Sequence, residues 1–157
     1  MNEHVLEELY KKWAYANMCI EIKINEGGRI ATDPEERWIK DYCLSTMNRQ
    51  RFVQYIQRAA YENLGLTIRE LVKLLSCSRK AVETMITELE PSELIEKTKN
   101  NKGIYTYKGT DKLLNFHLNY SKWLFRCCTD VGIRHTATAI TELESMTEHE
   151  GVKLLRI

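Results

Sequence analysis

The sequence predicts a mainly α-helical fold that carries one small β-hairpin. Apolar residues recur at three- and four-residue spacing through most of the chain, as they do on one buried helix face. Helix-favouring residues dominate, and only two prolines and seven glycines occur, which argues against a long flexible tail. Residues 94–108 differ, because two short runs of strand-forming residues flank a turn rich in asparagine and glycine.

Residues 66–112 begin with two short amphipathic helices, and we expect the fold to be organised around this stretch. Thr67 is a good N-cap for the first helix, and Glu70 follows three residues later, as a capping box requires. Ser78 is the N-cap candidate of the second helix, which should end before Pro91. About three residues separate the helices, so they should cross steeply. Their inward faces are Ile68, Leu71, Val72 and Leu75, and Ala81, Val82, Met85, Ile86 and Leu89.

The predicted hairpin follows directly, with strands at 94–99 and 104–108 and a basic turn at 100–103. Between positions 97 and 112 there are five lysines and one acid, which gives a local net charge of +4. Such a hairpin suits contact with phosphates, because bound ammonium groups release counterions. The order of helix, tight turn, helix and hairpin is that of a winged helix-turn-helix, whose second helix normally enters a DNA groove.

This outline resembles the winged-helix core of the multiple-antibiotic-resistance regulator (MarR) family. LTIRELVKLLSCSRKAVETMITELE is similar to the two helices of that family, and LIEKTKNNKGIYTYKGTDKLL to its wing and the start of the next helix. The family usually has glycine where this chain has Glu93, a departure to which we assign no structural consequence. Asn101–Lys102 replaces the Asp-Arg pair of the family's wing.

The resemblance also implies a homodimer and a small-molecule effector. A ligand pocket between the dimerisation and DNA-binding regions would be lined by Trp13, Trp38, Tyr120 and Trp123. The alternative is that these aromatic residues belong to the core or to an interface.

Helices are predicted on both sides of this core. Residues 3–20 form an amphipathic helix with inward residues Val5, Leu6, Leu9, Tyr10, Trp13 and Ile20. Alternation from Cys19 to Asn25 then predicts a strand that pairs with 29–31, although a helix that continues to Ile24 is the alternative. A second helix is capped by Thr32 or Asp33, carries Pro34 at its first position and continues to Cys43, with Trp38, Ile39 and Tyr42 on one side.

A third helix starts at Ser45 or Asn48 and ends near Asn63, with Gly65 as its C′ residue. Its inward residues are Phe52, Val53, Ile56 and Ala60. After the wing, a long helix runs from the cap Thr110 to about 129, with the apolar stripe Leu113, Leu114, His117, Tyr120, Trp123, Leu124, Cys127 and Cys128. Gly132 breaks it, and a last helix at 136–148 turns Ile140, Leu143 and Met146 inward.

The terminal helices carry more apolar and aromatic residues than a core of this size absorbs, which usually marks a partner. We therefore expect a homodimer built from three regions. Residues 1–47 form an N-terminal helical dimerisation or support region, and residues 48–112 form the winged helix-turn-helix core that binds DNA. Residues 113–157 form a C-terminal helical dimerisation region.

The candidate DNA-binding residues lie on the outer face of the second helix of the pair and on the wing. They are Ser78, Arg79, Lys80, Thr84 and Thr87 on the helix, and Lys97, Lys99, Asn101 and Lys102 on the wing. Ser78 would donate to a phosphate at the helix N-terminus. Glu83 either accepts from a cytosine amino group or repels phosphate. The alternative is a solvated face on a winged helix that binds protein.

Other chemistries find little support in the sequence. The five cysteines are an odd number without the spacing of a disulfide framework, and Cys127 and Cys128 point about 100° apart on a helix, so they cannot easily share one zinc ion. We interpret these two as buried structural thiols and expect Cys77 to fill a small apolar slot between the helices. No metal, cofactor or catalytic motif is predicted, so we do not expect an enzyme. Residues 1–10 lack the apolar run of a signal peptide, no stretch is long enough to span a membrane, and the chain is expected in the cytoplasm.

Together these patterns predict a homodimeric transcription regulator that binds double-stranded DNA, with the second helix in the major groove and the wing on the backbone. The net charge of +1 neither favours nor opposes this prediction. The rival is a winged-helix module for protein–protein interaction, for instance one that docks on the transcription machinery without binding DNA. Near-neutral charge and Glu83 favour that rival.

Overall fold

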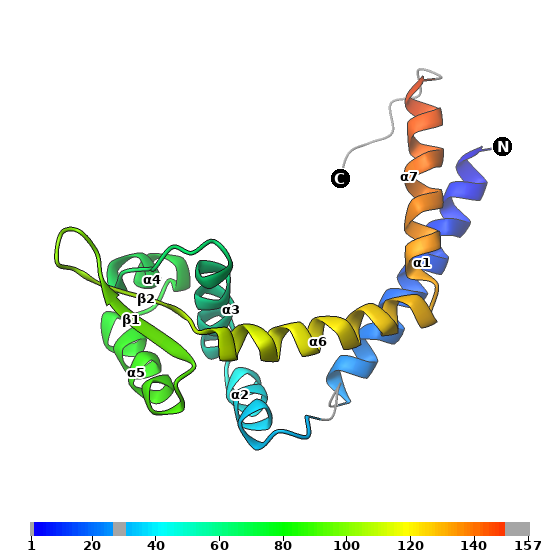
Figure 1. Cartoon of the computed structure of the whole chain (residues 1–157). Helices are drawn as coiled ribbons and strands as arrows, with labels where there is room; N and C mark the ends of the chain where they lie inside the picture. Colours follow the sequence, from blue (N-terminus) through cyan, green and yellow to red (C-terminus); the bar gives the residue numbers. More distant parts are fainter. Residues whose placement is uncertain (1, 27–30, 150–157) are drawn as a thin grey trace. The chain divides into compact units, whose positions relative to one another are not determined.

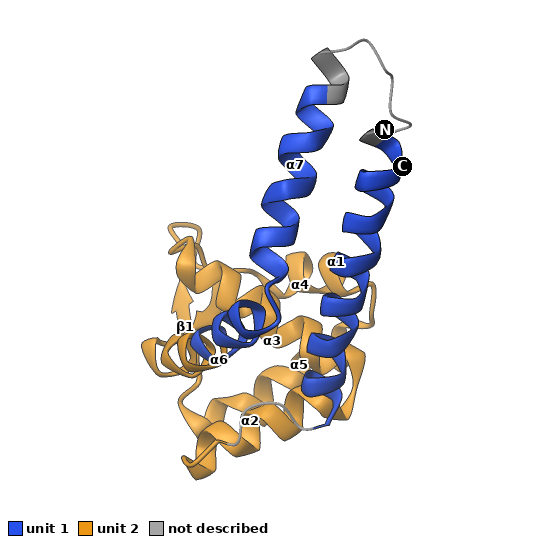
Figure 2. Ribbon diagram, turned by 90° about the vertical axis from the view of Figure 1, so that its right-hand side faces the viewer, with its two compact units in different colours: residues 1–29, 121–157 blue, residues 30–120 orange. Residues whose placement is uncertain are grey.

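The structure, a computed structural model, describes residues 2–26 and 31–149. These residues form seven α-helices, one 3-10 turn and a two-stranded antiparallel sheet, so the predicted fold class is confirmed (Figure 1). The chain divides into two compact units, residues 30–120 and residues 1–29 with 121–157 (Figure 2). The predicted division into three regions, with dimerisation roles for the outer two, stays a prediction.

The 30–120 unit contains the helix-turn-helix and the wing. Its elements are α2 (Pro34–Ser45), α3 (Met47–Tyr61), α4 (Ile68–Leu75), α5 (Arg79–Leu89), the 3-10 turn Glu90–Ser92, β1 (Ile95–Lys99), β2 (Tyr105–Gly109) and the first half of α6 (Asp111–Asp130). β1 and β2 pair antiparallel, with Ile95 opposite Gly109 and Lys99 opposite Tyr105. We call residues 95–109 the wing; its turn projects on the side away from α6 (Figure 1).

The predicted caps of α4 and α5 are confirmed. Both hydrogen bonds of the capping box are present, from the Glu70 amide to Thr67 Oγ1 and from the Thr67 amide to Glu70 Oε2. Ser76 then takes a left-handed conformation with φ of 51°, which turns the chain sharply. Ser78 Oγ accepts from the Ala81 amide at 3.1 Å and starts α5.

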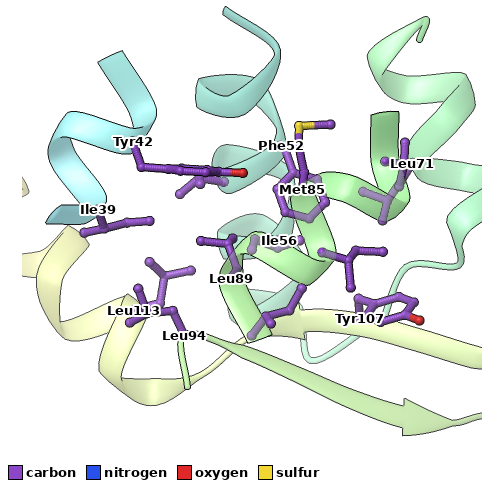
Figure 3. Close-up of a cluster of buried hydrophobic side chains, with 14 of the residues drawn as sticks. Ile39, Tyr42, Phe52, Ile56, Leu71, Met85, Leu89, Leu94, Tyr107 and Leu113 are labelled. Atoms are coloured by element: carbon purple, nitrogen blue, oxygen red, sulfur yellow. The ribbon is translucent and has the colours of Figure 1, made fainter. Parts of the chain in front are cut away.

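One hydrophobic core joins these elements. Its fully buried side chains come from α3, α4, α5, the residue just before the wing and α6 (Figure 3): Phe52, Ile56, Leu71, Leu75, Val82, Leu89, Leu94 and Leu113. Burial of a large apolar side chain contributes about 1.5–3 kcal/mol. The helix-turn-helix, the base of the wing and the start of α6 are therefore held as one body.

The other unit contains α1 (Asn2–Asn25), which packs beside α7 (Ile133–His149). The strand predicted from Cys19 is wrong, and the alternative of a continuing helix is confirmed. Ala16 and Ile20 are buried four residues apart, which is a helical and not a strand period. Residues 29 and 30 lie outside the described residues.

Exposure corrects the predicted inward faces of the terminal helices. Leu6 and Ile20 are buried, but Val5, Tyr10 and Trp13 on α1 and Met146 on α7 are exposed. The apolar residues of α1 are spread over two faces of the helix, and α7 packs on one of these faces. Trp38 on α2 is exposed as well, with its ring stacked on Tyr42 at 5.5 Å between centroids.

The end of α3 also differs from the prediction. The left-handed residue after the helix is Asn63, with φ of 51°, and not Gly65. Gly65 is needed for space, because a Cβ there would collide with the Thr106 side chain. The helix begins at neither predicted cap but at Thr46, whose Oγ1 accepts from the Arg49 amide. Its fully buried alanine is Ala59, one residue before the predicted Ala60.

Glu93, to which we assigned no structural consequence, lies in the left-handed region with φ of 57°. This conformation costs an L-residue about 1–2 kcal/mol, because Cβ approaches the following carbonyl oxygen. Glycine is free of that clash, so the geometry explains why glycine suits the residue before the wing. The departure at this position is therefore strained.

We predict that Glu93→Gly stabilises the protein by about 0.5–1 kcal/mol, since relief of the strain exceeds the extra entropy that glycine loses on folding. Urea denaturation followed by circular dichroism measures the change. Glu96→Gly, three residues later in β1, is the matched control and should destabilise. Equal destabilisation by both substitutions would contradict the prediction.

Candidate nucleic-acid interface

The outer face of α5 is exposed and polar. Ser78, Arg79, Lys80, Thr84 and Thr87 are all exposed, while Val82, Met85, Ile86 and Leu89 on the opposite face are buried. The structure therefore brings the five predicted helix residues together on one surface.

The polar groups of this face are already oriented. Thr84 Oγ1 donates to the Lys80 carbonyl and Thr87 Oγ1 to the Glu83 carbonyl, each at 2.9 Å. Their hydroxyl hydrogens are thus used within the helix, and oxygen lone pairs and methyl groups remain for a ligand. Ser78 Oγ is an acceptor in the N-cap bond, so its hydroxyl hydrogen remains available for a phosphate. Arg79 Nε donates to Glu83 Oε1 at 2.7 Å.

The wing has one cationic face. Lys97 and Lys99 are two residues apart on β1, so their side chains lie on the same face of the wing. Tyr105 lies opposite Lys99 on β2. The Tyr105 ring centroid is 4.5 Å from Lys97 Nζ and 5.0 Å from Lys99 Nζ, which are cation–π distances. The sequence analysis missed Tyr105. Pairing the two strands in register would have found it, because residues directly opposite share a face.

The other face of the wing is close to neutral. Glu96 Oε2 is 3.7 Å from Lys108 Nζ, and the hydroxyls of Thr98 and Thr106 are 3.1 Å apart. The positive charge of the wing therefore lies mainly on the Lys97 and Lys99 face. Lys97 Nζ is also 3.8 Å from Glu90 Oε1, just after α5.

Asn100 shapes the turn of the wing. Its Oδ1 accepts from the backbone amides of Lys102 and Ile104, each at 3.0 Å, and Gly103 takes a φ of 73°. Asn101 and Lys102, both predicted contacts, are exposed in this turn. Asn100 was predicted only as a turn residue, and its side chain is what fixes the turn's geometry.

A polar network anchors α5 from its other end. Glu88 accepts from Tyr42 Oη at 2.8 Å and from Arg49 Nε at 3.1 Å, so it joins α5 to α2 and α3. The hydrogen bonds from Arg49 lower the pKa of Glu88, against an opposing effect of desolvation. Burial and the bond to Glu88 raise the pKa of Tyr42, which stays protonated as a donor. Charge-assisted bonds of this kind are stronger than neutral ones.

The thiols and the aromatic residues give weaker evidence of a functional site than α5 and the wing do. Cys127 is buried and Cys77 packs against the core, as predicted, whereas Cys128, also predicted to be buried, is only partly buried. Burial raises the pKa of Cys43 to about 12, so that its thiol is protonated. Among residues 2–26 and 31–149, no group of three or more His, Cys, Asp or Glu could hold a metal ion. None of the described helices is both long and apolar enough to cross a membrane. Trp13 and Trp123 belong to one unit and Trp38 and Tyr120 to the other, so the pocket stays a prediction.

Comparisons with known proteins settle the fold. No family model and no curated protein matches the sequence. Solved structures of Staphylococcus aureus MepR do match. A point mutant is 15% identical, covers 87% of this chain and 96% of its own, and gives a TM-score of 0.52. The MepR–DNA complex is 14% identical, with coverage of 84% and 98% and a TM-score of 0.50. MepR, described as a transcription regulator of a multidrug efflux pump, is 14% identical in a further structure, with coverage of 73% and 89% and a TM-score of 0.50.

This chain has the winged-helix fold. MepR is a MarR-family winged-helix regulator, so the resemblance predicted from the sequence is confirmed at the level of the fold. At 14–15% identity, these structures establish the fold of this chain alone.

The Glu88 network predicts a pH-dependent contribution to stability. Because the folded pKa of Glu88 is lowered, its contribution is full above about pH 4.5, its ordinary pKa, and is lost as pH falls through the lowered value. Glu88→Gln should therefore cost about 1 kcal/mol at pH 7 and less at pH 3. Urea denaturation at both pH values measures this, with Glu142→Gln on α7 as control. A cost independent of pH would contradict the assignment.

Proposed function

We propose that this chain is a homodimeric transcription regulator that binds double-stranded DNA through α5 and the wing. The observation that carries the proposal is the polar outer face of α5, whose opposite face is locked into the core of the same unit as a hairpin with one cationic face. α5 would enter the major groove, and Lys97, Lys99, Asn101 and Lys102 would contact the backbone. The fold shared with MepR, one of whose structures is a DNA complex, supports this reading.

The proposed homodimer rests on a second apolar stripe along α1. Tyr15, Met18 and Ile22 recur at helical spacing and are exposed, whereas Leu6, Ala16 and Ile20 are buried, on the helix that packs beside α7. Exposed apolar stripes of this kind usually mark an interface. A second copy of the chain would cover it and would present two copies of α5 to DNA.

A protein-docking winged helix is the second candidate. The Arg79–Glu83 pair leaves the outer face of α5 with less free positive charge than its basic residues suggest, and the whole chain carries only +1. Such a surface would bind a polar protein partner and would bind duplex DNA no better than background.

Salt titration of binding to duplex DNA separates the two candidates. A DNA-binding chain should lose affinity steeply as salt rises, and Lys99→Ala and Lys102→Ala should each reduce the slope of log K against log salt by about 1. Lys122→Ala, which removes an exposed lysine on α6, is the control and should leave the slope unchanged. Absence of binding at low salt would favour the protein partner.

Sedimentation velocity at micromolar concentration tests the dimer. The wild-type chain should sediment at about twice its mass of 18.5 kDa. Met18→Lys with Ile22→Lys should shift it towards monomer, because charges would enter an apolar interface. Glu21→Lys introduces the same side chain outside the stripe and should remain dimeric. A wild-type monomer would rule out this part of the proposal.

A further inference from the structure

The ion pair at the start of α5 uses only one of the three guanidinium nitrogens of its arginine. Arg79 is the first residue of the helix, and its Nε donates to Glu83 Oε1 at 2.7 Å. Within the described ranges the guanidinium makes no other hydrogen bond, so its two terminal nitrogens are open to a ligand. The side chains of Arg79 and Glu83 are 75% and 46% exposed.

Helix stability gives little reason for this pair. A cation in the first turn faces the positive end of the helix dipole, and a basic residue placed four positions before an acid is the poorer order. Exposed pairs of this kind contribute only a few tenths of a kcal/mol. What the pair does provide is a restricted position for a long and flexible side chain.

The pair also directs Arg79 onto the outer face. Residues seven apart on a helix lie nearly on one line, so Arg79 starts above Ile86, which is buried. Arg79 therefore leaves the helix at the edge of the exposed surface. Glu83 lies about 40° further round, towards Lys80 and Thr87, and draws the guanidinium onto the surface that they share.

We propose that Glu83 is a positioning residue that holds Arg79 so that its terminal nitrogens read one guanine in the major groove. The inference rests on the proposed function. Guanine presents O6 and N7 as neighbouring acceptors, which two nitrogens of one arginine can bind together. Residues at the N-terminus of a groove-bound helix are those that reach base edges.

A phosphate is the poorer ligand for this arginine. A phosphate that approached the guanidinium would also approach the Glu83 carboxylate, and the two negative charges would repel. The guanine edge is uncharged, so the carboxylate can stay in place while the terminal nitrogens bind. Glu83, which was hard to reconcile with DNA binding, thereby gains a role in selectivity.

Selection of bound fragments from random duplex DNA tests the inference in the full-length protein. The wild-type motif should contain one guanine per half-site whose preference disappears in Arg79→Ala, a loss of about 5- to 150-fold in discrimination. Glu83→Ala should lower that preference by up to about twofold while non-specific affinity rises, because an acid has been removed. Glu83→Gln should keep the preference, since its amide oxygen still accepts from Nε.

The outcomes separate the two proposals. If the wild-type chain binds no duplex, the proposed function fails. If it binds but Arg79→Ala weakens all sequences equally, Arg79 contacts phosphate and the inference is overturned while the function stands. A guanine preference unchanged in Glu83→Ala would also overturn it. Asp41→Ala, which removes an exposed acid on α2, is the control and should leave the motif and the non-specific affinity unchanged.

Discussion

The burial of one face of α5 is the constraint on which the rest of the structure depends. Val82 and Leu89 on that face are wholly shielded from solvent, packed in the core with Phe52 and Leu113 from α3 and α6. Glu88 adds bonds to α2 and α3. Because the buried face cannot turn, the polar face must point outward. Packing of the buried face, more than charge, therefore determines which residues of α5 form the candidate interface.

Local signals in the sequence predicted the centre of the fold well. A capping box or an N-cap depends on residues three positions apart, so Thr67, Glu70 and Ser78 could be assigned without knowing the rest of the structure. The hairpin was predicted to within a residue for the same reason, because its turn residues are adjacent. The predicted face of α5 followed from the helical period alone, and its exposure agrees with the structure.

The predictions that were wrong or incomplete concern features that depend on contacts between residues far apart in the sequence. The choice between strand and helix after Cys19 is settled by packing against α7, more than a hundred residues away. Gly65 was assigned a conformational role, but its absence of Cβ serves close contact with Thr106 on β2. Tyr105 gains its place beside Lys97 and Lys99 only when the strand register is known. None of these pairings can be read from neighbouring residues.

Ion pairs, as much as the number of charged residues, determine where this protein carries unpaired positive charge. Glu83 pairs with Arg79 on α5 and Glu96 pairs with Lys108 on the other face of the wing, so the positive charge of the wing lies mainly on the Lys97 and Lys99 face in a chain of net charge +1. The most direct test of the account is an NMR titration of the labelled protein with duplex DNA at low salt. The amide signals of residues 78–87 and of the wing turn should shift most. Shifts confined to other elements, with α5 unchanged, would contradict the central claim that this helix face is the DNA-binding surface.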